Sequence, residues 1–201
     1  MSHVTTAPPM APAPTTARIV GRWMVSFAGF PLGGFAALVL TDPVDSVGHA
    51  LIGGLVTGAV LGAVQSWALR SDRRQLVAWT AATALGLAVG LALGASLVDF
   101  GTTMSALATQ GAVTGAVVGL TQAAVLFPRT GAVALVWPFY LAGAYALGWV
   151  VTTAGGIAVE DQFTTFGSFG AVTVALLTSV LPVFLARPDS SRPTTTEKSS
   201  S

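Results

Sequence analysis

The sequence contains no cysteine and very few charged residues. Asp, Glu, Lys and Arg make up only 8% of its 201 residues, whereas about 25% is usual in a soluble domain. The lack of cysteine excludes disulfide bonds and thiol catalysis, and it leaves the redox compartment undetermined. The formal net charge of +1 gives no indication of nucleic-acid binding. Such a shortage of charge is typical of membrane proteins.

Ionisable side chains are also absent from the middle of every long apolar run. Asp, Glu, Lys, Arg and His all lie in the tails, in the short polar segments or close to the ends of the runs. Proton relays, ion-coupled transporters and membrane hydrolases usually need such groups inside the bilayer, where they are otherwise costly. We therefore expect a protein that is not an enzyme and that has no cofactor and no metal site.

The sequence is instead rich in apolar residues, which make up 53% of it and give a mean hydropathy of +0.74. A helix needs about 20 such residues to cross the hydrocarbon core of a bilayer. Six runs of this kind are present, at 19–40, 47–69, 76–98, 104–127, 132–153 and 166–186. None of them alternates as a membrane strand would. The sequence predicts an all-α, polytopic integral membrane protein with six transmembrane helices over residues 18–186, between disordered tails at 1–17 and 188–201.

The basic residues lie on one side of this predicted membrane domain. With six spans, all nine Lys and Arg residues fall on the side of the two termini: Arg18, Arg22, Arg70, Arg73, Arg74, Arg129, Arg187, Arg192 and Lys198. The opposite loops carry only acidic charge, at Asp42, Asp45, Asp99, Glu160 and Asp161. Positively charged loops tend to stay in the cytoplasm. The prediction is a multi-pass protein of the cell membrane with both termini cytoplasmic.

A repeated segment organises the chain. GLVTGAVLGAVQ at 54–65 recurs as GAVTGAVVGLTQ at 111–122, and eight of the twelve positions are identical. Glycines four residues apart lie on one face of a helix, and such faces let membrane helices approach closely. A third glycine row lies at 86–94. We expect helix packing through Gly54, Gly58, Gly62, Gly86, Gly90, Gly94, Gly111, Gly115 and Gly119.

Tryptophan spacing extends the repeat to the whole membrane domain. Trp23, Trp79 and Trp137 follow one another at intervals of 56 and 58 residues. A degenerate third copy begins at Gly170, with Leu181 at the position that matches Gln65 and Gln122. The sequence thus predicts three parallel helical hairpins of about 57 residues, at about 18–70, 75–129 and 130–187, arranged as a ring or as a row. These tryptophans, with Trp67 and Trp149, fall near span ends, where indole rings commonly anchor at the membrane surface.

A few polar side chains inside the spans are the candidate functional residues. Gln65 and Gln122 follow the glycine rows, and the weaker candidates are Gln110, Thr57 and Thr114. One interpretation is structural, with the glutamines hydrogen-bonded between helices and the threonines bonded to their own backbone. The other is that they line a site for a polar ligand. Pro31, Pro138 and Pro182 are expected to kink the helices that contain them.

Two functions are compatible with this sequence. The first is a non-enzymatic scaffold or accessory subunit in the lipid bilayer, which associates with itself or with a membrane-complex partner through glycine-striped helices. The alternative is a small transporter, channel or binder of an apolar or weakly polar ligand. A closed helix bundle favours the first, and an internal cavity lined by Gln65, Gln122 and threonines favours the second.

Overall fold

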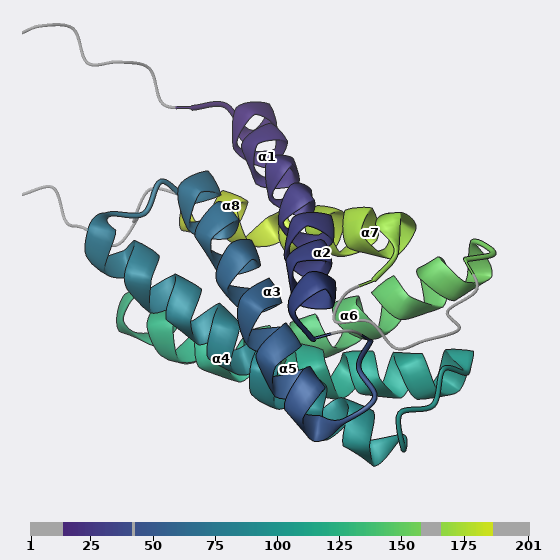
Figure 1. The fold of residues 1–201 in the computed structure, drawn as a ribbon. Helices are drawn as coiled ribbons and strands as arrows, with labels where there is room; N and C mark the ends of the chain where they lie inside the picture. The colour runs from purple at the N-terminus through teal and green to yellow at the C-terminus, as the bar shows by residue number, and fades with distance from the viewer. Residues whose placement is uncertain (1–13, 42, 158–165, 187–201) are drawn as a thin grey trace, which may run out of the picture.

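The computed structural model describes residues 14–41, 43–157 and 166–186, and all its regular elements in these ranges are helices (Figure 1). The predicted tail at 188–201 and the residues 42, 160 and 161 lie outside this part of the chain, and so do residues 1–13 of the predicted tail at 1–17. The α-helices are α1 Thr16–Met24, α2 Gly29–Thr41, α3 Val47–Ala68, α4 Arg73–Leu97, α5 Met104–Thr130, α6 Trp137–Ala154, α7 Ser168–Thr178 and α8 Val180–Leu185. Two 3₁₀ segments, η1 Val25–Ala28 and η2 Gly131–Val136, precede α2 and α6.

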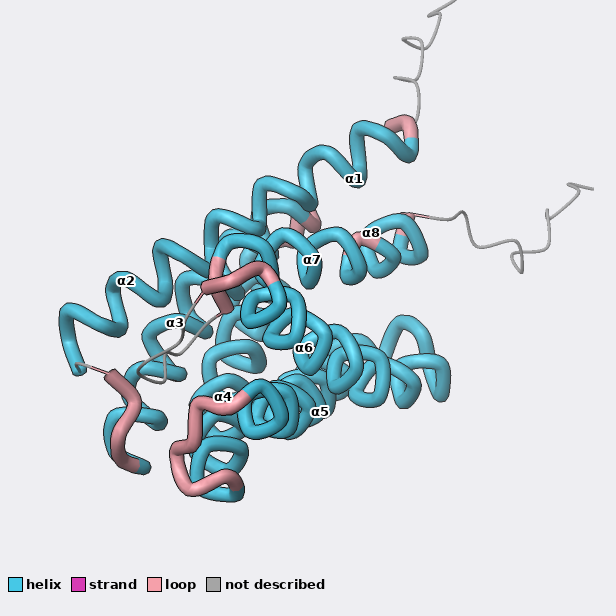
Figure 2. The backbone as a smooth tube through the Cα atoms, turned by 90° about the vertical axis from the view of Figure 1, so that its right-hand side faces the viewer, coloured by secondary structure: helices cyan, strands magenta, loops and turns pink. Residues whose placement is uncertain are grey.

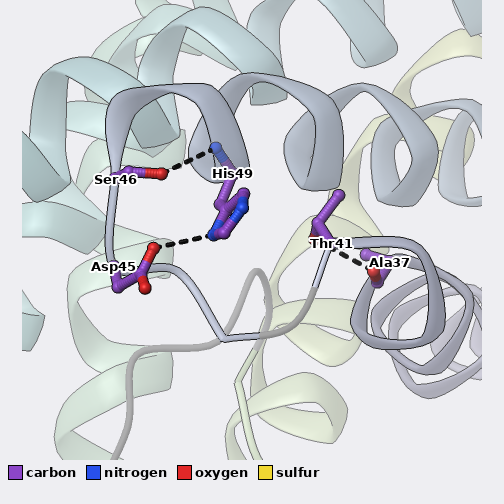
Figure 3. Close-up of polar contacts among 5 residues, drawn as sticks. All are labelled: Ala37, Thr41, Asp45, Ser46 and His49. Carbon is purple, nitrogen blue, oxygen red and sulfur yellow. Dashed lines mark hydrogen bonds and ion pairs between the residues drawn. The ribbon is translucent and has the colours of Figure 1, made fainter.

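The predicted runs coincide with these helices because their ends carry suitable capping residues. Ser46, Asp72 and Thr103 precede α3, α4 and α5, and each side chain accepts a hydrogen bond from a backbone N–H in the first turn. At the start of α3 the Ser46 hydroxyl accepts from the N–H of His49 at 3.2 Å, and the His49 ring contacts Asp45 at 2.7 Å (Figure 3). The polar turn between α2 and α3 therefore fixes where α3 begins.

The three prolines that were expected to kink helices all lie in the first turn of a helix, just after a break in the helical chain. Pro31 has no N–H for the carbonyl of Phe27, and the chain there passes through η1 between α1 and α2. Pro138 likewise occupies the first turn of α6, after η2. Pro182 lies just after the break between α7 and α8, where the Tyr140 hydroxyl donates to the carbonyl of Leu177 at 2.7 Å.

In the described part of the chain, five helical segments are long and apolar enough to cross a membrane, which is typical of an all-helical membrane protein. They are Thr16–Thr41, Val47–Ala68, Arg73–Leu97, Met104–Ala154 and Ser168–Leu185. The fourth segment is 51 residues long and holds both α5 and α6, which the sequence prediction counted as separate spans. These two helices are antiparallel, since Gly119 lies against Pro138 and Gly111 against Tyr145.

The contacts between helices form a closed cycle. Each helix from α2 to α6 packs on the next helix in the chain, and α7 and α8 both contact α1. Figure 2 shows the result: α1 and α2 follow one another along one line, and α7 and α8 lie beside them. The contacts between the described helices therefore have the connectivity of a ring.

Charge separates the two ends of the bundle. At one end, called the basic end, lie the arginines of α1, the α3–α4 turn and the last turn of α5: Arg18, Arg22, Arg70, Arg73, Arg74 and Arg129. Arg22 donates to the carbonyl of Ala68, and Arg129 donates to the Gln75 side chain at 2.9 Å, which ties these elements together. The α2–α3 and α4–α5 turns, with Asp45 and Asp99, lie at the other end, called the acidic end.

Candidate functional site

The glycine rows lie against the backbone of the next helix in the chain. A Cβ added to Gly54, Gly58 or Gly62 would lie 2.6–2.8 Å from a backbone atom of α4. Gly86, Gly90 and Gly94 face α5 in the same way, and Gly111, Gly115 and Gly119 face α6. All nine predicted packing glycines are therefore used inside the chain, where they let neighbouring helices approach closely.

Gln65 and Gln122 are buried, with 7% and 2% of their surface exposed. Each accepts a hydrogen bond from a tryptophan of the next helix. The indole nitrogen of Trp79 lies 3.0 Å from Gln65 Oε1, and that of Trp137 lies 2.8 Å from Gln122 Oε1. Gln122 also donates from Nε2 to the hydroxyl of Thr83 at 2.9 Å. The bond to Gln65 joins α4 to α3. The two bonds of Gln122 join α5 to α4 and to α6.

The third tryptophan makes the corresponding bond between the first and last parts of the chain. Trp23 Nε1 donates to the hydroxyl of Thr178 at 3.1 Å. Thr178 lies in α7, three residues before Leu181, the position that the predicted repeat matches to the two glutamines. A threonine thus supplies the acceptor here, and the three indole bonds join α4 to α3, α6 to α5 and α1 to α7.

A small cavity lies among these three bonds. Its lining consists of the three tryptophans and their acceptors, together with Leu141, Tyr145 and Val174. The volume available to the centre of a water-sized sphere is about 10 Å³, which corresponds to about one water molecule. Gln65 and Gln122 therefore line one cavity, without Thr57 or Thr114, and this cavity has no room for a metabolite.

A second cavity of the same size lies farther along the bundle, toward the acidic end. Gln110 and Thr114 line it from α5, Leu87 and Leu91 from α4, and aromatic rings cover the rest. The rings belong to Phe30, Tyr145, Trp149 and Phe166, and Tyr145 also lines the first cavity. The two cavities therefore follow one another along the middle of the bundle, with Tyr145 between them.

The outer surface carries two larger hollows. One has a volume of about 200 Å³ and lies near the basic end between α5, η2, α6 and α8, with a mostly apolar lining that includes Leu126, Ala134, Leu181 and Phe184 beside Thr130 and Tyr140. The other is an open groove of about 320 Å³ along α6, lined by Phe139, Tyr140, Gly143, Ala144, Leu147 and Leu177. Phe139 is 80% exposed there.

The structure changes the roles of several residues named from the sequence. Trp23, Trp79, Trp137 and Trp149 are buried among helices, so the expectation of surface anchors was wrong for all but the half-exposed Trp67. Thr57 donates to the carbonyl of Gly33 in α2 at 3.1 Å, so its bond is not confined to its own helix. The tryptophan donors and the Thr178 acceptor were missed, although the regular tryptophan spacing was their signal.

Comparison of the chain with protein-family models, with curated proteins and with solved structures finds no match. The proposals below therefore rest on the geometry of this chain alone.

Proposed function

We propose that the chain is a non-enzymatic membrane protein with six spans, in which α5 and α6 each cross the bilayer. The antiparallel packing of α5 on α6 supports two crossings within Met104–Ala154. The beginning of α1 and the end of α8 lie at the same end of the bundle (Figure 2), which is the basic end because α1 carries Arg18 and Arg22. Because basic loops are retained in the cytoplasm, both termini are placed on the cytoplasmic side of the cell membrane.

The six spans are three parallel hairpins around one axis. Three equivalent indole bonds support this repeat, because each joins the first helix of a hairpin to the second helix of the hairpin before it, and the Trp23–Thr178 bond completes the set. The glycine rows at 54–62 and 111–119 also occupy matching places, each against the helix that follows.

The proposed role is that of a scaffold or accessory subunit. The observation that carries it is the filled interior, where the two cavities on the axis offer about 10 Å³ each. A passage for a solute would need a much wider path, since this volume suits about one water molecule. The groove along α6 is the surface that this role assigns to a partner helix or to a second copy, because Gly143 there would let a helix approach closely.

Mass spectrometry of the intact protein, purified from its membrane in mild detergent, tests this role. The expected result is a dimer or a co-purifying membrane protein that is lost in Gly143→Leu and retained in Gly21→Leu. These variants are matched, because a Cβ added at either glycine meets no heavy atom within 4 Å in the described residues. A parent protein that is monomeric and without a partner contradicts the proposal.

The apolar hollow near the basic end supports a second candidate, the binding of an apolar ligand. Its volume of about 200 Å³ and its apolar lining suit part of an acyl chain or a small hydrophobic molecule. Ala134 is buried in the lining and Ala132 is exposed outside it. A ligand that co-purifies with the parent and with Ala132→Phe, but not with Ala134→Phe, would favour this function over a scaffold.

A further inference from the structure

Gln110 differs from the other two glutamines of the bundle interior. Its side chain is only 1% exposed, and neither Oε1 nor Nε2 has a hydrogen-bond partner among residues 14–41, 43–157 and 166–186. Gln65 and Gln122, by contrast, each accept an indole N–H. A buried amide without a partner is strongly unfavourable, so each such group in a native fold needs an explanation.

Thr114 shares this property and the same helix face. It follows Gln110 by one helical turn, is 4% exposed, and its Oγ1 also has no partner in the described part of the chain. Its counterpart in the first copy of the repeat, Thr57, donates to the carbonyl of Gly33. The position that matches Gln110 in that copy is Gly53. The second hairpin therefore departs from the first at these two positions, where it gains an amide and lacks the interhelical threonine bond.

Both side chains line the aromatic cavity described above, toward the acidic end. Ring contacts seal its wall: the centroids of Tyr145 and Phe166 are 5.0 Å apart, and those of Trp149 and Phe166 are 5.4 Å apart. The volume open to the centre of a water-sized sphere is about 10 Å³. A polar cavity of this size holds about one water molecule.

The chemistry of the lining selects among guests of this size. Gln110 offers an acceptor at Oε1 and donors at Nε2, and the Thr114 hydroxyl can donate and accept. A guest that satisfies the amide must therefore both donate and accept. An ammonium or alkali cation cannot accept from Nε2, and no carboxylate is among the described lining residues to balance its charge. Water meets both requirements, and buried waters commonly make about three hydrogen bonds.

From this size, burial and pairing we infer that the cavity is a binding site for one water molecule, held by the Gln110 amide and the Thr114 hydroxyl. The water links two polar groups of α5 inside a wall built from α2, α4, α6 and Phe166, two residues before α7. This site is independent of the scaffold role, because it concerns only the interior of a single chain.

NMR of the full chain in lipid nanodiscs, with ¹⁵N-labelled glutamine side chains, tests the site. The measurement is magnetisation transfer from water to the side-chain amide protons. The Gln110→Met variant is the control, because it removes this amide and leaves the other glutamines in place. The expected result is a cross-peak from water to the Gln110 amide, assigned by its disappearance in Gln110→Met. Absence of transfer at Gln110 overturns the inference.

Thr114→Val gives a second measurement in case Gln110→Met does not fold. Valine keeps the shape of the side chain and removes its hydroxyl, so the water loses one partner while the amide stays. The expected result is a weaker cross-peak at Gln110 with the fold retained. A cross-peak of unchanged strength shows that Thr114 does not hold the guest and contradicts the proposed site.

Discussion

The indole nitrogen of Trp23 and the hydroxyl of Thr178 lie 3.1 Å apart, although 155 residues separate them in the sequence. Both side chains are buried, at 1% and 4% exposure. The Thr178 hydroxyl donates to the carbonyl of Val174 in its own helix at 2.7 Å, which leaves its lone pairs for the indole. This bond joins α1 to α7.

We predict that Thr178→Val destabilises the protein by about 1–3 kcal/mol, because the buried indole N–H of Trp23 loses its acceptor. Thermal unfolding in detergent measures the effect. Thr173→Val on the same helix is the control, since its hydroxyl bonds only to the carbonyl of Phe169 in the described structure. Equal effects of the two variants would show that the indole bond contributes nothing to stability.

The second prediction concerns Gln122 and Trp137. Gln122→Leu should cost about 1–3 kcal/mol, because an indole N–H can only donate and is left unpaired. Adding Trp137→Phe removes that donor, so the cycle of single and double variants should show a coupling of about 0.6 to 1.7 kcal/mol. Chemical or thermal unfolding of the four proteins gives these values. Additive effects would contradict a direct bond.

The third prediction uses the glycine rows. A Cβ at Gly58 would lie 2.6 Å from the Cα of Ala84, and one at Gly115 would clash with the carbonyl of Leu141. Gly58→Leu and Gly115→Leu should each destabilise the fold by about 1–3 kcal/mol or more. Gly21→Leu is the matched control, since a Cβ at Gly21 meets no heavy atom within 4 Å in the described structure. Equal melting temperatures for the three variants would refute close packing at the rows.

The fourth prediction concerns orientation. The chain has no cysteine, so single cysteines can be placed at the exposed positions of Arg74, at the basic end, and Ser105, near the acidic end. In intact cells, an impermeant maleimide should label the cysteine at 105 and not the one at 74, because basic loops face the cytoplasm. Labelling at 74 alone would invert the proposed topology.

Helix type and helix boundaries were predictable because apolar runs and polar turns depend on local sequence. The runs at 47–69 and 76–98 match α3 and α4 to within three residues. The glycine rows were identified because a period of four needs no knowledge of the partner helix. Their partners, however, are set by tertiary packing, which a single sequence does not contain.

The roles of the tryptophans could not be predicted, because an indole near a span end suits both the membrane surface and a buried bond. Trp79 belongs to the second kind only because Gln65 lies across the α3–α4 interface. Gln110 was a weak candidate for a similar reason. Its departure from Gly53 was visible in the repeat, but only the folded chain shows that its amide is enclosed by aromatic rings.

The bond between Trp23 and Thr178 can form only late in the synthesis of the chain. During synthesis at about 5–20 residues per second, the 155 residues between them take roughly 8 to 30 s to emerge. Through that interval α1 is in the membrane without α7, and its indole N–H has yet to meet its native acceptor. The ring can close only after the last hairpin arrives. A stalled or truncated chain would therefore expose the same inner face of α1 that the finished protein hides, and membrane quality control could distinguish the two by that face.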